Sequence, residues 1–392
     1  MISSRILYKA IALHKFEKYP FERLNELLEN INPNKNYELS SLTIGEPQFN
    51  TPDFIQEELK NSTALLNKYP KSSGEIFLKE AMRNFILKRF SVDISNEQII
   101  PTFGTREVLF NFPQFLLFGK KDATIAYPNP FYQIYEGAAI ACNAKVIHMD
   151  MTKENNFLVN LTVEQMKKAD LVILNYPSNP TSATISKKDL SAWVQNALKY
   201  DFVLINDECY SELYFEEDNK PISLLEACIE AGNSEYKNCL VLNSISKRSS
   251  APGLRSGFIA GDKDILKEYM NYRTYVGCAL PLPLQKTAAV AWNDEKHVAD
   301  FRKIYKENFV LAKEILGVDI PNATFYIWLE VEDELKFTQE LFKKENIKVL
   351  PGSFLGRNGI GKNYIRIALV ENNEKTKKVL LRLKNFIDEY KA

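Results

Sequence analysis

A lysine among small hydroxyl side chains is the strongest chemical signal in the sequence. Lys247 lies in the segment NSISKRSSAPGLRSGF, directly after an apolar run, and Arg255 follows within a Gly-x-Arg-x-Gly pattern. A flexible surface lysine is seldom flanked by so many small residues. Because lysine amines form Schiff bases with carbonyl ligands and arginine binds anions, we predict a reactive amine at Lys247, close to an anionic group held by Arg255 with Ser244 as a further donor.

Two charged residues stand in or directly after apolar runs, where each needs a partner. Asp207 ends the run FVLIND, and Arg366 interrupts YIRIALV. An unpaired buried charge is costly. Asp207 therefore either caps a helix or pairs with a protonated ring nitrogen of a ligand. Arg366 either forms an internal salt bridge or binds a carboxylate through two parallel hydrogen bonds.

Three further polar motifs follow apolar runs, and each allows two interpretations. Thr105 in FGTREVLF either caps a helix or helps to bind phosphate at the helix N-terminus. Tyr132 in PNPFYQIY either stacks on a planar ligand or packs between sheet and helix. Asn179 in NYPSNPT is either a turn residue or an amide aimed at a ligand.

These residues need a scaffold, and the first two thirds of the chain predict an α/β fold. Short apolar runs alternate with helix-period stretches at 75–90, 132–141 and 186–200. This pattern predicts a large domain with a mainly parallel sheet and helices on both faces, with ligands beyond the carboxyl ends of its strands. The last two runs are too close for a crossover helix, so they are candidates for an irregular or antiparallel edge. The runs are 123–127, 171–175, 202–206, 239–243 and 257–261.

The C-terminal third predicts a smaller α+β domain. Helical stretches at 333–344 and 373–391 separate the strand-like segments, and the N-terminal helical segment is expected to pack on this unit. We therefore expect a large domain at 49–285 and a small domain built from 1–48 and 286–392. The strand-like segments are 325–331, 347–352 and 364–370.

Composition limits the classes of function. Lys plus Arg and Asp plus Glu both total 50 of 392 residues, so the zero net charge argues against a nucleic-acid surface. The five cysteines form no C-x-x-C pair, which favours a reducing cytoplasm, and three scattered histidines offer no metal site. No apolar run is long enough to span a membrane, and residues 1–20 are interpreted as an amphipathic helix rather than a signal peptide.

Taken together, the motifs resemble the fold type I pyridoxal-phosphate enzymes, class I/II aminotransferases. The resemblance runs from SLTIGEPQFNTP at 41–52, through KYPKSSGE at 68–75, to YIRIALV at 364–370. Its most specific element is S-x-x-K followed by arginine eight residues later. One departure is Ser182, where the family often has the glycine of N-P-T-G; if that position needs a positive φ, serine carries a cost.

The resemblance implies roles for individual residues. Lys247 would bind pyridoxal 5′-phosphate covalently and transfer the proton at the substrate Cα, and Asp207 would pair with the pyridine nitrogen. Tyr210 and Asn179 would bond to the phenolic oxygen, and Tyr132 would stack on the ring. Tyr69 would reach the phosphate in a neighbouring subunit, which implies a homodimer. The expected phosphate ligands are Gly104, Thr105, Arg106, Ser244 and Arg255. Arg366 would bind the substrate α-carboxylate, and Gly45 and Asn179 would line the same substrate site.

Longer matching segments, such as SKRSSAPGLRSGF and AWNDEKHV, look like the succinyldiaminopimelate aminotransferases of bacterial lysine and diaminopimelate biosynthesis. The implied substrates are glutamate and N-succinyl-2-amino-6-oxopimelate. Alternative enzymes with the same fold are aspartate, aromatic or alanine aminotransferases and C–S lyases. A third alternative is a ligand-sensing domain that has kept the fold and lost catalysis. Arg23 and Arg273 are candidates for the N-succinyl group or distal carboxylate only by charge and by lying in segments near the expected pocket, and a surface or salt-bridged role for them is favoured.

Overall fold

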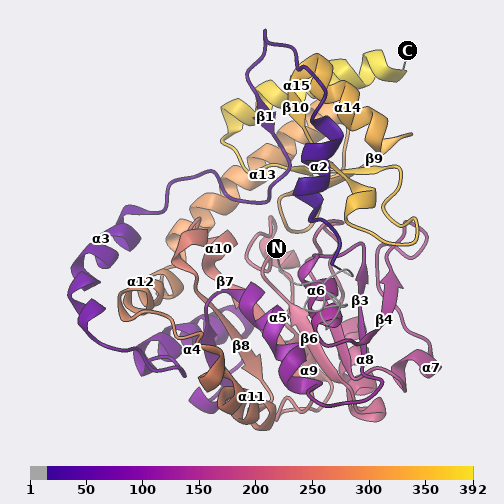
Figure 1. Cartoon of the computed structure of the whole chain (residues 1–392). Helices are drawn as coiled ribbons and strands as arrows, with labels where there is room; N and C mark the ends of the chain where they lie inside the picture. Colours follow the sequence, from indigo (N-terminus) through magenta and orange to yellow (C-terminus); the bar gives the residue numbers. More distant parts are fainter. Residues whose placement is uncertain (1–15, 392) are drawn as a thin grey trace, which may run out of the picture.

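The computed structural model describes residues 16–391 of the chain. The amphipathic helix predicted for residues 1–20 therefore lies mostly outside the described residues. Figure 1 shows a large unit around a central sheet and, above it, a smaller unit that contains both the first described helix and the C-terminal helix. None of the helices within residues 16–391 is long and apolar enough to pass through a membrane.

Within the described residues, the largest sheet has seven strands in the order β2-β8-β7-β6-β5-β3-β4. Neighbouring strands from β4 to β7 run parallel, whereas β8 is antiparallel to both β7 and β2. The antiparallel arrangement predicted for the last two apolar runs is confirmed, but β8 is not an edge strand because β2 lies outside it. The strands are β2 (Ile99–Thr102), β3 (Thr124–Asn129), β4 (Lys145–Asp150), β5 (Leu171–Leu174), β6 (Val203–Asp207), β7 (Cys239–Ser244) and β8 (Gly257–Gly261).

Helices cover both faces of this sheet, which explains the continuous apolar runs. The neighbouring residues Leu204 and Ile205 of β6 belong to two different hydrophobic cores, one on each face. Parallel strands that are buried on both sides need apolar residues at every position. One core is formed with α5 (Thr105–Leu116), α6 (Ile134–Ala141) and α11 (Lys263–Val276), and the other with α4 (Ile76–Phe90), α8 (Lys187–Tyr200), α9 (Leu224–Glu230) and α12 (Leu282–Asn293).

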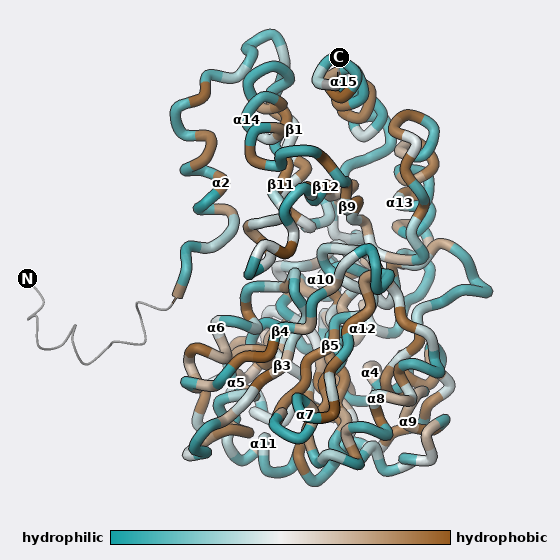
Figure 2. The backbone as a smooth tube through the Cα atoms, turned by 90° about the vertical axis from the view of Figure 1, so that its right-hand side faces the viewer, coloured by the Kyte–Doolittle hydropathy of each residue, from teal (hydrophilic) through white to brown (hydrophobic). Residues whose placement is uncertain are grey.

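The smaller unit contains an antiparallel sheet of strands in the order β11-β12-β9, and a short parallel pair formed by β1 and β10. Because β1 precedes the large sheet in sequence and β10 follows it, the chain returns to this unit. Figure 2 shows α2, α13, α14 and α15 around it. The elements are β1 (Ser40–Ser41), β9 (Tyr326–Glu330), β10 (Ile347–Lys348), β11 (Leu350–Pro351), β12 (Tyr364–Ala368), α2 (Pro20–Leu28), α13 (Lys296–Leu316), α14 (Glu334–Glu345) and α15 (Asn373–Lys391).

Helix α12 bears on the boundary between the two units. It packs on α4 and on α3 (Asp53–Ser62), and its residues Ala288 and Trp292 belong to a core of the large sheet. The boundary expected between residues 285 and 286 falls inside this helix. We therefore propose that the small domain resumes after α12, and that residues up to 48 complete it through the pairing of β1 with β10.

Candidate active site

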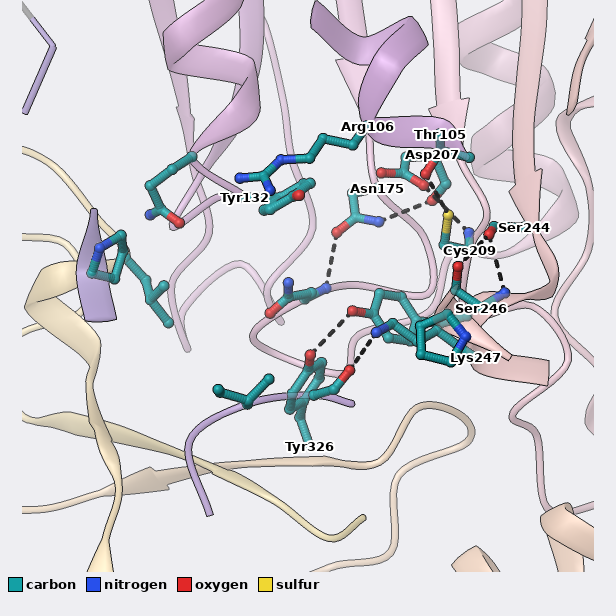
Figure 3. A pocket seen from close by; sticks show the side chains of 18 of the residues that line it. Thr105, Arg106, Tyr132, Asn175, Asp207, Cys209, Ser244, Ser246, Lys247 and Tyr326 are labelled. Atoms are coloured by element: carbon teal, nitrogen blue, oxygen red, sulfur yellow. Dashed lines mark hydrogen bonds between the residues drawn. The ribbon is translucent and has the colours of Figure 1, made fainter. Parts of the chain in front are cut away.

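A cavity of about 640 Å³ lies where the carboxyl ends of β5, β6 and β7 face the smaller unit. This is the position at which parallel α/β sheets bind ligands. Figure 3 shows side chains from both units pointing into it. Of the residues singled out in the sequence, the cavity is lined by Gly45, Thr105, Arg106, Tyr132, Asn179, Asp207, Tyr210, Ser244, Lys247, Arg255 and Arg366.

Lys247 projects from α10 (Ile245–Arg248), a single turn of helix that begins where β7 ends. The Ser244 side chain caps this turn by accepting a hydrogen bond from the Ser246 backbone N–H at 3.1 Å. The Lys247 Nζ donates to the backbone oxygen of Gly45, which lies in the segment that connects β1 of the smaller unit with α3. The lysine is therefore held at the junction of the two units.

The surroundings of Lys247 favour its neutral, nucleophilic form. Burial lowers the pKa of Lys247 to about 8, and the positive charges of Arg366 and Arg255 act in the same direction. A neutral amine is the form that attacks carbonyl carbon. The predicted reactive amine is thus supported by the electrostatics of the cavity.

Asp207 lies buried at the end of β6, in contact with neutral donors. Its Oδ2 accepts a hydrogen bond from the Tyr135 hydroxyl at 2.9 Å, and its Oδ1 accepts one from the Cys209 backbone N–H at 3.3 Å. Within residues 16–391 it forms no ion pair. Burial raises the pKa of Asp207, although both hydrogen bonds oppose that shift. A cationic group of a ligand would compensate this carboxylate.

Arg255 and the turn before α5 form a cradle for an anion. Gly104 has a φ of +77°, and a Cβ there would come 2.2 Å from the Arg255 Nη2, so only glycine leaves room for the guanidinium. Arg255 donates to two backbone oxygens, those of Pro252 at 2.8 Å and Phe103 at 3.2 Å. The backbone N–H groups at the start of α5 favour negative charge at the same place.

The side chain of Arg366 is buried in β12, and no acidic partner pairs with it among residues 16–391. Its guanidinium donates to the Asn179 Oδ1 at 2.7 Å and to the Thr43 backbone oxygen at 2.6 Å, and it stacks over the Tyr326 ring at 4.4 Å. The buried Nε has no hydrogen-bond partner among the described residues. The internal salt bridge, one of two interpretations of the sequence, is absent from this part of the chain, and a carboxylate ligand would supply the missing charge.

Among the cavity residues that were not predicted from the sequence are Tyr135, Asn175 and Tyr326. The Tyr210 hydroxyl lies 3.1 Å from the Tyr326 hydroxyl, and the Asn175 amide donates to the Asp207 backbone oxygen at 2.9 Å. Tyr135 and Asn175 stand in motifs that were already singled out, so closer inspection of PNPFYQIY and NYPSNPT would have found them. Tyr326 lies in an ordinary strand pattern and offers no signal.

The remaining predicted residues lie in different surroundings. The Arg106 guanidinium extends toward Tyr132, away from Ser244, and donates to the Tyr19 hydroxyl at 2.9 Å (Figure 3). Tyr69 is fully exposed and does not line the cavity, and its role toward a neighbouring subunit stays a prediction. The described residues contain no cluster of His, Cys, Asp and Glu that could bind a metal ion.

The two arginines considered for a distal carboxylate are engaged elsewhere. Arg273 is buried and forms a two-fold hydrogen-bonded pair with Glu107, at 3.0 and 3.1 Å. Arg23 stacks on the Phe354 ring at 4.2 Å and does not line the cavity. Both positions fit the structural role that the sequence favoured.

Comparison with known proteins agrees with this geometry. A family model described as aminotransferase class I and II matches residues 38–383. The LL-diaminopimelate aminotransferase of Natranaerobius thermophilus is 31% identical, over 96% of this chain and 99% of its own length. The aminotransferase AspB of Helicobacter pylori has a TM-score of 0.93 at 49% identity, covering 95% of this chain and 99% of the other. For an aminotransferase of Neisseria meningitidis the TM-score is 0.92 at 37% identity, with 97% and 99% covered. The chain therefore belongs to the class I and II aminotransferases, enzymes that use pyridoxal 5′-phosphate.

Proposed function

We propose that this enzyme transfers the amino group between glutamate and N-succinyl-2-amino-6-oxopimelate, a step of diaminopimelate and lysine biosynthesis. The observation that carries the amino-transfer chemistry is one cavity with three unsatisfied requirements. The pKa of Lys247 is lowered by burial. Among the described residues, no cation pairs with the buried Asp207 and no acid pairs with the buried Arg366. An amino acid and the cofactor together would satisfy all three.

The donor set fits pyridoxal 5′-phosphate. We assign the pyridine nitrogen to Asp207, because a buried carboxylate keeps a neighbouring ring nitrogen protonated. The phosphate is assigned to Arg255, Thr105 and Ser244 with the Gly104 backbone. Tyr132 is assigned to the ring face. The phenolic oxygen is assigned to Tyr210 and to the amide N–H₂ of Asn179, since its oxygen is occupied by Arg366.

The side chains of the protein then divide the remaining tasks. When bound, the cofactor accepts the electron pair released as the substrate loses its Cα proton. Lys247 would remove that proton from Cα and, as a general acid, deliver it to C4′ of the cofactor. Arg366 binds the α-carboxylate and thereby sets the direction of the Cα–H bond. Asp207 holds the proton on the ring nitrogen, and this charge makes proton removal favourable.

Arg106 is the cavity residue that favours a substrate with a long, acid-terminated side chain. The Arg106 guanidinium lines the cavity, is exposed and contacts the Tyr19 ring and hydroxyl. It is therefore suited to a carboxylate at the end of a substrate side chain. The apolar walls of the same cavity would cover the methylene groups of that chain. These wall residues are Phe21, Ile44, Leu350 and Leu355.

The names of the relatives point in a similar direction without fixing the substrate. The curated relative from Natranaerobius thermophilus is named for LL-diaminopimelate, which also carries two distant carboxylates. The apolar walls favour a second candidate, the aromatic amino acids, and a relative from Thermococcus litoralis is named for these. Aspartate, alanine and C–S lyase substrates lack this support from the cavity.

A substrate panel tests the proposal. We expect amino transfer from glutamate to N-succinyl-2-amino-6-oxopimelate to have the highest kcat/KM, above transfer with aromatic or alanine donors. An Arg106→Met variant should lose about tenfold or more on the acid-terminated substrate and little on phenylalanine. Equal losses on both substrates, or a preference for aromatic donors in the parent enzyme, would contradict the substrate assignment.

We also propose that the enzyme is a cytoplasmic homodimer. Tyr69 is fully exposed and Leu66 is 73% exposed. The segment that is expected to contact a neighbouring subunit therefore has an uncovered apolar surface. The thiols of Cys228 and Cys239 interact with each other and remain free, which fits a reducing compartment. Sedimentation of the purified protein tests the dimer, and Tyr69→Phe should weaken cofactor retention if the phenol reaches the partner's phosphate.

A further inference from the structure

Two residues with positive φ meet at the boundary between the large and the small unit. Ser182 has a φ of +61° and Thr324 a φ of +80°. Neither is glycine, and a β-branched residue in this region is a marked outlier. Backbone strain of this kind persists only where the surrounding contacts maintain it. The contacts that these two side chains make must therefore maintain the strain.

The two hydroxyl groups form a closed hydrogen-bonded arrangement. The Ser182 Oγ donates to the backbone oxygen of Tyr326 at 2.8 Å. Because a hydroxyl has one hydrogen, the 2.5 Å contact between the two hydroxyls is a donation from Thr324 to Ser182. The Thr324 Oγ1 also accepts from the Tyr326 backbone N–H at 3.1 Å. Both hydroxyl residues are buried, so water does not compete for these bonds.

This arrangement joins the two supports of Arg366. Ser182 lies three residues after Asn179, whose Oδ1 accepts a hydrogen bond from the guanidinium at 2.7 Å. Thr324 lies two residues before Tyr326, whose ring stacks on the same guanidinium at 4.4 Å. One support belongs to a loop of the large unit and the other to β9 of the small unit. The hydroxyl pair, named here the Ser182–Thr324 latch, fixes the distance between them.

We propose that the Ser182–Thr324 latch positions Arg366 for the α-carboxylate of the substrate, and that Ser182 is a positioning residue rather than a catalytic one. This inference rests on the proposed function, in which Arg366 binds that carboxylate. The serine hydroxyl compensates for the unfavourable φ by joining the two units, a contact that glycine at this position could not make. The latch therefore acts more strongly on substrate affinity than on cofactor binding, because the cofactor is also assigned to Lys247, Asp207 and Arg255, whereas the substrate carboxylate depends on Arg366.

Binding of 2-oxoglutarate to the cofactor-loaded enzyme tests the latch. In this form the keto acid has no amino group to transfer, so its dissociation constant reports binding alone. Ser182→Gly removes the hydroxyl and relieves the φ strain, and we expect the dissociation constant to rise about tenfold, the effect of losing a buried hydrogen bond. The kcat for glutamate should change less than about threefold, and cofactor affinity should fall less than affinity for 2-oxoglutarate.

Variants at the second position provide the matched controls. Thr324→Val keeps the shape without the hydroxyl and should reproduce the loss of 2-oxoglutarate affinity, whereas Thr324→Ser keeps the hydroxyl and should bind as the parent does. Affinity within about twofold of the parent in both Ser182→Gly and Thr324→Val would overturn the inference, and so would an equal loss of cofactor affinity. A parent enzyme that neither binds 2-oxoglutarate nor transfers amino groups would instead refute the proposed function.

Discussion

The phenol of Tyr135 donates a hydrogen bond to the Asp207 carboxylate at 2.9 Å, and both groups are buried. The bond stabilises the carboxylate without neutralising its charge. Because burial raises the pKa of Asp207 and this bond opposes the shift, Tyr135 helps to keep the acid ionised until a cationic ligand arrives. Tyr135 thus contributes to the electrostatics of the site from α6, the helix that connects β3 and β4.

The Tyr135→Phe variant tests this contribution. We expect kcat/KM to fall about tenfold, since hydrogen bonds to charged groups contribute about 1.5–3 kcal/mol. Loss of the donor raises the pKa of Asp207 further, so the decline of activity on the acid side should begin at a higher pH than in the parent enzyme. Asp207→Ala serves as the reference and should lose more, roughly 3–4 kcal/mol of transition-state stabilisation. An unchanged acid limb for Tyr135→Phe would contradict the role assigned to the phenol.

The residues that the sequence predicted best are those that end or follow a strand. Asp207 and Ser244 each follow an apolar run, and such positions meet at one edge of a parallel sheet. Their convergence therefore depends only on local patterns and the order of strands. The same reasoning failed for β4, an edge strand whose Lys145 and Val146 are exposed, because it shows no continuous apolar run.

Contacts between distant segments could not be predicted. Arg366 stacks on Tyr326 and bonds to Asn179, 187 positions away, and these distances depend on how the two units pack. The direction of the Arg106 side chain likewise depends on Tyr19, the residue directly before helix α2 of the small unit. Such relationships require the packed tertiary structure, since no local residue pattern encodes them.

Lys247 should destabilise the cofactor-free protein at neutral pH. The pKa of Lys247 is about 8 in the folded protein, below the value of about 10.5 in an unfolded chain. Between these values the unfolded chain binds more protons, so stability should rise as the pH increases from 8 to 10.5. A Lys247→Met variant should be inactive, more stable at pH 7 by about 1–3 kcal/mol, and without that rise.

Urea unfolding of the cofactor-free proteins at pH 7 and pH 10 measures this effect. Lys286, which lies over the Phe77 ring and does not line the cavity, offers a control for replacing lysine with methionine, and Lys286→Met should not gain the stability expected of Lys247→Met. Residual turnover in Lys247→Met, or a variant that unfolds more readily than the parent at pH 7, would argue against a desolvated reactive amine.

The buried pair of Arg273 and Glu107 should hold in place the turn before α5, to which the cofactor phosphate is assigned. Glu107 also accepts a hydrogen bond from the Phe103 backbone N–H at 2.8 Å, and Arg273 donates to the Pro101 backbone oxygen at 3.2 Å. Arg273→Met leaves a buried carboxylate without its partner and should cost about 3–5 kcal/mol of unfolding free energy. A double variant that also carries Glu107→Leu should recover part of this loss.

A more exposed ion pair provides the comparison for that series. Arg382 and Glu345 are 3.3 Å apart and each is about one fifth exposed. Arg382→Met should therefore cost less than about 1 kcal/mol. If Arg273→Met cost no more than Arg382→Met, the buried pair would have no special part in supporting the turn. Cofactor affinity, measured by equilibrium dialysis, should fall for Arg273→Met and not for Arg382→Met.

Ser249, His297 and Asp294 have the connectivity of a hydrolytic triad, yet they should be structural. The His297 Nδ1 lies 2.5 Å from an Asp294 oxygen and its Nε2 lies 2.9 Å from the Ser249 hydroxyl. Ser249 is completely buried, so no substrate reaches it. We expect a fluorophosphonate probe for reactive serines to leave the folded protein unlabelled. Labelling at Ser249 with loss of a hydrolytic activity would refute the structural role.

The same histidine should make the protein sensitive to acid. Burial lowers the pKa of His297 below its ordinary value of 6.5, so the folded protein holds the neutral ring. Below that pH the unfolded chain binds a proton that the folded chain resists, and stability should fall as the pH decreases from 6.5. His297→Gln cannot take up this proton, so its unfolding free energy should depend less on pH between 6.5 and 5 than that of the parent. Equal slopes in urea titrations of the two proteins would show that His297 does not contribute.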